Sequence, residues 1–174
     1  AHLPCSYPSL QRSDPPGALV YLDDRTVVYL KRTAENAAAI ARNEYRLVTP
    51  LEFYSGEVIA RMPRARFADL EQELIRLAAA DPADSIQARL LLAQIYIQVY
   101  RHEEALTLLR GTMATAPHAY RPHALLAAWY ARQEKWADAA REFETAIDLA
   151  GVTAGRFDYN YVAQVFEKTG DPVK

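Results

Sequence analysis

The sequence predicts a mainly α-helical protein in which antiparallel helical hairpins follow a small α+β amino-terminal element. Alanine-rich apolar stripes recur at helical spacing through the second part of the chain, and only short loops separate them. Before that region, prolines and β-branched runs interrupt the helical pattern. We expect an extended arm over residues 1–17, a small α+β element over residues 18–65 and a helical repeat domain over residues 66–174.

Composition places the chain among ordinary globular proteins. It has 174 residues, of which 51% are hydrophobic and 24% are charged, and its net charge is −2. Because no basic field is present, nucleic acid and anionic lipid are disfavoured as partners. The longest apolar stretch, from Leu90 to Tyr100, contains Gln94 and Gln98 and is far shorter than the roughly 20 residues that cross a bilayer. We expect no membrane span.

The amino-terminal arm contains several prolines and the single cysteine, Cys5. One cysteine can form neither an internal disulfide nor a thiolate zinc site by itself. The chain starts at Ala1 rather than methionine, and a single cysteine is compatible with an oxidising compartment. We therefore expect a periplasmic or otherwise secreted protein, with a cytoplasmic location as the alternative.

A short hairpin is expected after the arm. Residues 18–22 and 26–30 are β-branched and aromatic runs that flank Asp23, Asp24 and Arg25. Paired aspartates can act as a general acid and base, but aspartate is also the ordinary choice in a turn, where its side chain binds local backbone amides. The turn is the favoured interpretation.

The rest of the α+β element is less regular. Thr33 can cap a helix that runs to about Tyr45, through the strongly helix-forming residues 34–41. Further on, Ser55-Gly56 joins two apolar runs, which predict either a second hairpin or a helix ended by Pro63. The periodicity does not separate these two possibilities.

Helical segments fill the remainder of the chain. Breaks occur at Asp81-Pro82, Ala116-Pro117, Gly151 and Gly170. The expected segments are 66–80, 84–100, 102–115, 119–133, 135–150 and 156–169.

Two of these hairpins repeat each other with an offset of 34 residues (126 minus 92). Small residues match small ones and large residues match large ones, so each helix pair has the same room for close packing. The matched pairs are Leu92 and Leu126, Ala93 and Ala127, Tyr96 and Tyr130, Ala105 and Ala139, and Leu109 and Phe143. Pro117 closes the first repeat.

On these residues, the chain resembles the tetratricopeptide repeat (TPR) family, with about two full repeats over residues 84–150. Partial repeats lie on either side: Val162, Ala163 and Phe166 match a third first helix, and Leu70 and Leu74 match a preceding second helix. Glu57 and Arg61 occupy slots that should be apolar, so the helix before that one departs from the pattern.

The resemblance implies a short α-superhelix whose concave wall, formed by the first helix of each repeat, binds an extended peptide or a partner helix. The implied partner-binding residues are Gln87, Gln94, Gln98, Arg121, Ala128, Arg132, Tyr161, Gln164 and Lys168. This surface is polar and mildly basic. For any one of these residues, simple solvation of an exposed helix face is the alternative.

The last helix carries two apolar stripes. One, expected to pack inward, consists of Tyr159, Val162, Ala163 and Phe166, and the other of Phe157, Tyr161 and Val165. We expect Phe157 and Tyr161 to contact a partner protein, a second copy of the chain or the amino-terminal element. In the alternative, Val165 packs inward and only the two aromatics stay half exposed.

Other constellations predict neither an enzyme nor a cofactor site. His118 and His123 lack the spacing that directs two imidazoles at one metal, and no Gly-x-Gly loop could hold a phosphate. Trp129 aligns with Ile95 and Val165 in an inward column, which favours core packing over base or sugar stacking.

Two hypotheses about function follow. The first is a noncatalytic protein–protein interaction module, a scaffold or assembly factor that holds a protein or peptide in its concave groove. A homo-oligomer through the carboxy-terminal helix is also open. The alternative is an accessory or degenerate fragment of an enzyme, with chemistry in the amino-terminal α+β element.

Overall fold

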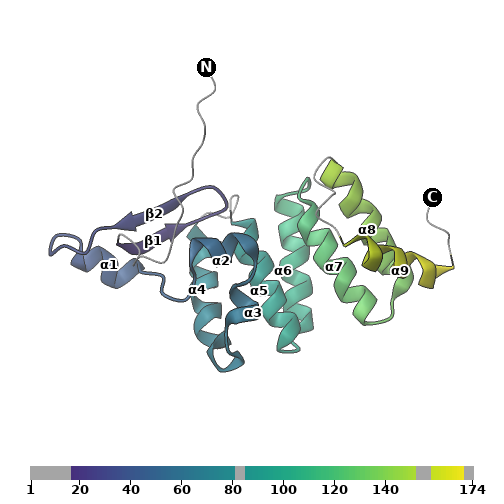
Figure 1. Ribbon diagram of the computed structural model, residues 1–174, viewed down its shortest axis with the longest axis horizontal. Coiled ribbons are helices and arrows are strands. Elements are labelled where there is room, and N and C mark those ends of the chain that lie inside the picture. The colour runs from purple at the N-terminus through teal and green to yellow at the C-terminus, as the bar shows by residue number, and fades with distance from the viewer. Residues whose placement is uncertain (1–16, 81–84, 152–157, 171–174) are drawn as a thin grey trace, which may run out of the picture.

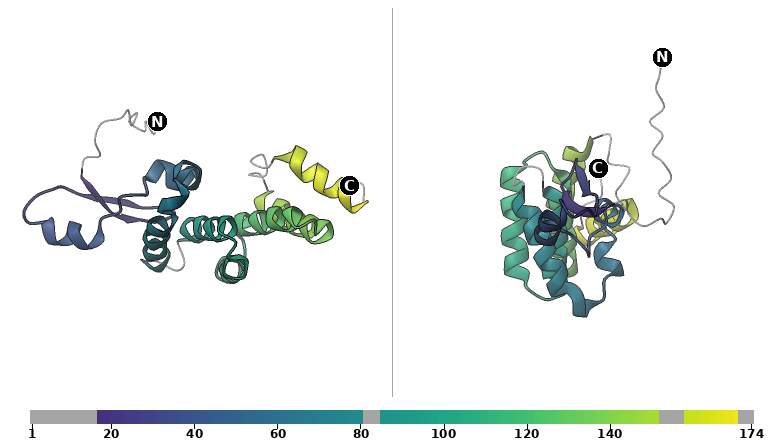
Figure 2. Two further views of the ribbon diagram at one scale, coloured as in Figure 1. Left: turned by 90° about the horizontal axis from the view of Figure 1, so that it is seen from below. Right: turned by 90° about the vertical axis from the view of Figure 1, so that its left-hand side faces the viewer.

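The structure is a computed structural model that describes residues 17–80, 85–151 and 158–170. The described part of the chain is mainly α-helical and includes one two-stranded sheet, which confirms the predicted fold class. Figure 1 shows the sheet and α1 at one end of an elongated molecule, with the later helices following in chain order towards α9 at the other end. The edge-on view in Figure 2 shows the same linear order.

The predicted first hairpin is confirmed. Strand β1 (Ala18–Leu22) pairs antiparallel with β2 (Val27–Leu30), and Ala18 lies opposite Leu30. Gly17 is required at the open end of the hairpin, because a Cβ atom there would lie 2.2 Å from the carbonyl oxygen of Leu30.

Helix α1 (Ala37–Asn43) is shorter than the helix predicted from Thr33 to about Tyr45. The side chain of Asn36 donates to the carbonyl of Lys31 at 2.9 Å, which stabilises a turn where the helix was expected to begin. After α1, the backbone N–H of Tyr45 donates to the carbonyl of Leu19 at 2.8 Å and ties the chain back to β1.

The predicted second hairpin is wrong, because residues 50–61 form two short helices. Helix α2 (Pro50–Ser55) begins with a proline at its first position and with Thr49, whose hydroxyl accepts from the N–H of Glu52. Gly56 ends it in the left-handed region at φ 79°, and α3 (Val58–Arg61) follows. A single glycine therefore breaks the helix in two.

A short 3₁₀ turn, η1 (Arg64–Arg66), leads into the stacked helices. These are α4 (Phe67–Ala80), α5 (Ile86–Gln98), α6 (His102–Thr115), α7 (Tyr120–Arg132) and α8 (Trp136–Ala150). They agree with the predicted segments to within two residues at each end. Helices α5 and α7 start 34 residues apart, and so do α6 and α8.

The turns inside the two hairpins share the same backbone geometry. Tyr100 and Glu134, also 34 residues apart, both have positive φ, at 64° and 57°. In each turn the next N–H reaches back to a tyrosine carbonyl, from Arg101 to Tyr96 at 2.8 Å and from Lys135 to Tyr130 at 3.0 Å. The 34-residue period is therefore a period of the backbone as well as of the sequence.

Buried alanines allow the helices of each hairpin to approach closely. Ala93, Ala105, Ala127 and Ala139, the small residues matched by the repeat, are at most 1% exposed. The inward column is also confirmed, since Ile95 and Val165 are 1% exposed and Trp129 is buried.

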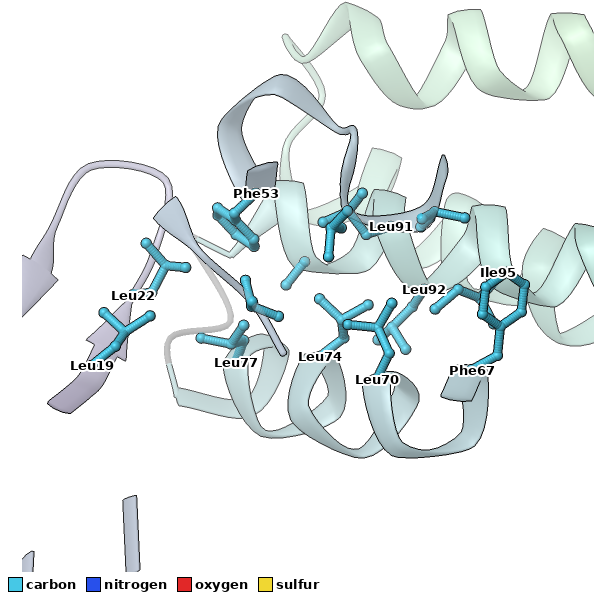
Figure 3. Close-up of a cluster of buried hydrophobic side chains, with 14 residues drawn as sticks. Leu19, Leu22, Phe53, Phe67, Leu70, Leu74, Leu77, Leu91, Leu92 and Ile95 are labelled. Atoms are coloured by element: carbon cyan, nitrogen blue, oxygen red, sulfur yellow. The ribbon is translucent and has the colours of Figure 1, made fainter. Parts of the chain in front are cut away.

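The amino-terminal element shares a core with the first stacked helices. Figure 3 shows Leu19 and Leu22 from β1 and Phe53 from α2 converging on leucines of α4 and α5, such as Leu74 and Leu91. Leu22, Phe53, Leu74 and Leu91 are fully buried. The hairpin, α2 and α3 thus form the first layer of the stack rather than an independent core.

Helix α9 (Tyr159–Thr169) corrects the predicted stripes of the last helix. Tyr159, expected to pack inward, is 48% exposed, and Val165, expected on the unpartnered stripe, is 1% exposed. Val162 and Val165 pack with alanines of α7 and α8, because the helix is rotated relative to the prediction. Val165 therefore follows the alternative stated above.

We predict that replacing Ala127 by leucine destabilises the fold by about 1 to 3 kcal/mol, because the added carbons have no room between α7 and α8. The free energy of unfolding in urea measures this effect. Ala137 on α8 is exposed, so Ala137→Leu is the matched control and should change stability by no more than about 0.5 kcal/mol. Equal stability of the two variants would contradict the packing described here.

Candidate functional site

Asp23 stabilises the hairpin turn with both oxygens of its carboxylate. Its Oδ2 accepts from the Tyr21 hydroxyl at 2.6 Å, and its Oδ1 accepts from the backbone N–H groups of Arg25 and Thr26 at 2.7 and 2.6 Å. Burial works to raise the pKa of Asp23, but these hydrogen bonds outweigh it and hold the pKa below its ordinary value. The side chain is thus an acceptor in a turn.

Asp24 reaches from the hairpin to the amino terminus of α5. Its carboxylate accepts from the backbone N–H of Gln87 at 3.0 Å, so it caps a helix 63 residues further along the chain. Burial raises the pKa of Asp24 above its ordinary value, against the lowering effects of the Gln87 and Ile86 N–H groups and of positive Arg121. Together, Asp23 and Asp24 form a structural joint between the hairpin and the stack.

Gln87 does not belong to the exposed wall on which the sequence analysis placed it. It is 3% exposed, and its side-chain amide donates to the carbonyl of Phe53 at the end of α2. Its Oε1 accepts no hydrogen bond from the part of the protein that is described. Gln87 is buried because the amino-terminal element covers the start of α5, which corrects its assignment as a partner-binding residue.

The other described wall residues lie on the first helices in two matching columns. One column consists of Gln98 on α5, Arg132 on α7 and Lys168 on α9, and the other of Gln94, Ala128 and Gln164. Gln94, Gln98 and Ala128 are half-buried, and Arg132, Gln164 and Lys168 are exposed. Arg121, at the start of α7, is exposed and close enough to Asp24 to affect its pKa. These side chains can offer amide hydrogen bonds and two or three positive charges to a ligand.

Tyr161 is only half-buried, because one side of its ring is used inside the chain. It packs edge-on against Phe143 of α8, with 6.0 Å between ring centroids. Phe157, its predicted companion, lies outside the described residues. Tyr161 can therefore present one edge to a partner at most.

The structure also contains a groove that the sequence analysis missed. Helices α4, α5 and α6 enclose about 550 Å³ between apolar side chains that include Ile75, Leu92 and Leu108. Ile75 is 40% exposed. A large apolar residue that lies off the buried stripe of α4 was the available sequence signal, but one residue does not define a groove.

No metal site or membrane helix is found within the described ranges. No three His, Cys, Asp or Glu side chains gather there as potential metal ligands. His102 instead accepts a hydrogen bond from the Trp129 indole at 3.3 Å, and His123 pairs with Glu142 at 2.7 Å. None of the described helices is both long enough and apolar enough to cross a bilayer.

No protein-family model matches the chain, and a search of curated proteins finds no match. The chemistry of its own surfaces therefore has to indicate what it binds.

Replacing Asp24 by alanine should destabilise the protein by about 1 kcal/mol, because α5 loses its cap. Asp24→Asn keeps an oxygen acceptor and removes the charge. Since the raised pKa means that the ionised form is disfavoured in the folded chain, the asparagine variant should be as stable as the parent at pH 7 or slightly more so. Urea unfolding of the three proteins measures this order, and a loss in Asp24→Asn equal to that in Asp24→Ala would contradict the cap.

Asp23 should make the protein sensitive to acid. Because its pKa is lowered by folding, its contribution to stability is complete above its unfolded-state value and is lost as the pH falls through the folded-state value. The free energy of unfolding of the parent should therefore fall as the pH drops below about 4. Asp23→Asn should be less stable at neutral pH and should show a smaller loss in acid, and parallel pH profiles would rule this contribution out.

Proposed function

We propose that the protein is a noncatalytic interaction module, a scaffold or assembly factor of the tetratricopeptide repeat type, whose first helices bind a protein or peptide partner. The observation that carries this proposal is the matched column of Gln98, Arg132 and Lys168 along a stack with a 34-residue backbone period. Polar and basic side chains at a regular spacing suit an extended ligand with acidic or polar groups.

The bonding of the paired aspartates favours this function over the enzymatic alternative. Asp23 uses both carboxylate oxygens inside the hairpin turn, and Asp24 caps α5. Both side chains therefore have structural roles that account for their presence. A periplasmic or otherwise secreted location and a homo-oligomer through α9 remain part of the proposal and rest on the sequence.

The proposal predicts that Gln98→Ala/Arg132→Ala weakens partner capture while the melting temperature shifts by less than about 2 °C, because exposed polar residues contribute little to stability. Affinity capture with the full chain, followed by mass spectrometry, measures which proteins are retained by the parent and lost by the variant.

The matched control removes the same two residue types from the second helices. Gln72 on α4 and Arg110 on α6 are both exposed, so Gln72→Ala/Arg110→Ala should leave capture unchanged. Equal capture by the parent and the Gln98→Ala/Arg132→Ala variant would argue against a site on the first helices.

A further inference from the structure

The groove between α4, α5 and α6 combines an apolar interior with an acidic edge. Leu92 and Tyr96 of α5 form its floor, Ile75 and Ala79 line the α4 side, and Leu108 lines the α6 side. Its volume of about 550 Å³ is sufficient for a few side chains of a ligand. Such an opening between second helices leaves apolar surface in contact with water, which is unfavourable unless a partner covers it.

The groove is specific to this step of the stack. At the corresponding positions one repeat later, Arg110 replaces Ile75 and Glu142 replaces Leu108. Glu142 is paired with His123 there, so the later interval is polar where the earlier one is apolar. A general requirement of helix stacking would have made the two intervals alike.

Carboxylates outnumber cations at the edge of the groove. Glu103 and Glu104 line it directly, and Glu71 lies next to Tyr96, whose hydroxyl it binds. A single guanidinium, that of Arg101, bridges Glu71 and Glu104 at 2.8 and 2.9 Å. Three carboxylates and one arginine leave an excess of negative charge beside the apolar floor.

This groove faces away from the wall used in the proposed function. Leu92 and Gln94 are two residues apart on α5, as are Tyr96 and Gln98, and two residues on an α-helix point about 200° apart. The groove and the column of polar residues therefore lie on opposite sides of the same helix. They differ in charge as well, since the column is basic.

We propose that the groove is a second docking site, which binds a short amphipathic segment of a partner protein carrying apolar side chains flanked by lysine or arginine. The apolar side chains would cover Leu92, Ile75 and Leu108, and the cations would approach Glu103 and Glu104. Charge complementarity selects this occupant, because an acidic segment would meet three carboxylates. The site is independent of the proposed function, which concerns the other side of α5.

Two designed peptides test the chemistry of the site. One is a helical 18-residue peptide of leucine and lysine with an apolar face, and the other has glutamate in place of lysine. Fluorescence anisotropy with the full chain should show that the leucine–lysine peptide binds at least about tenfold more tightly, because like charges repel the other. Equal affinity for the two peptides would overturn the proposal.

Two substitutions of one kind locate the binding. Ala79 on α4 and Ala114 on α6 are exposed alanines at corresponding positions, and only Ala79 lines the groove. Ala79→Lys should weaken the leucine–lysine peptide by about tenfold, since it places a cation in the groove, whereas Ala114→Lys should change its affinity by less than about twofold. Equal losses in the two variants would place the peptide elsewhere and overturn the proposal.

A second pair of variants tests the acidic edge. Glu103→Lys should weaken the same peptide, and Glu144→Lys, an equal change of charge on exposed α8, should not. The Gln98→Ala/Arg132→Ala variant should bind the peptide as the parent does. If groove variants have no effect while that variant loses its captured partner, the second site fails and the proposed function stands, and the reverse pattern separates them in the other direction.

Discussion

The close packing of helices at buried alanines is the constraint on which the rest of the structure depends. Ala93 and Ala127 on the first helices, and Ala105 and Ala139 on the second, leave no side chain between the helices of a hairpin. With that spacing fixed, the turns take one backbone geometry, with Tyr100 or Glu134 in the left-handed region. Bulky or charged residues are uncommon there, so the packing of the hairpins outweighs the local preference.

The amino-terminal element extends the stack by one layer, which it holds by polar as well as apolar contacts. Helices α2 and α3 lie where a first helix of a preceding repeat would fall, and Gly56 divides them. The broken helix cannot cover the start of α5 alone. Asp24 caps α5 from the hairpin, and Gln87 donates to Phe53 at the end of α2, so the hairpin and α2 are fastened to the same turn of α5. These contacts explain why chemistry-bearing residues lie in a joint.

Local sequence patterns predicted most of the helices but little of this joint. The segment expected over residues 102–115 forms α6 with the same bounds, because its apolar positions recur at helical spacing and a proline follows it. The burial of Gln87 had no such signal, since its partners Phe53 and Asp24 lie 34 and 63 residues away. Ser55-Gly56 suits a hairpin turn as well as a helix end, and only the burial of Phe53 and Val58 against α5 decides between them.

Helix α5 separates two surfaces of opposite charge, a feature that the net charge of −2 conceals. Its Gln98 side continues into Arg132 and Lys168, and its Tyr96 side continues into Glu71, Glu103 and Glu104. Both surfaces depend on the rotation of α5 about its axis, which Leu91 and Ile95 fix by packing in the shared core. A change in that core would displace both surfaces together, whereas a change at the edge of one leaves the other in place. A chain built in this way is suited to hold two chemically different partners on a single helix, each selected by charge and independent of the other.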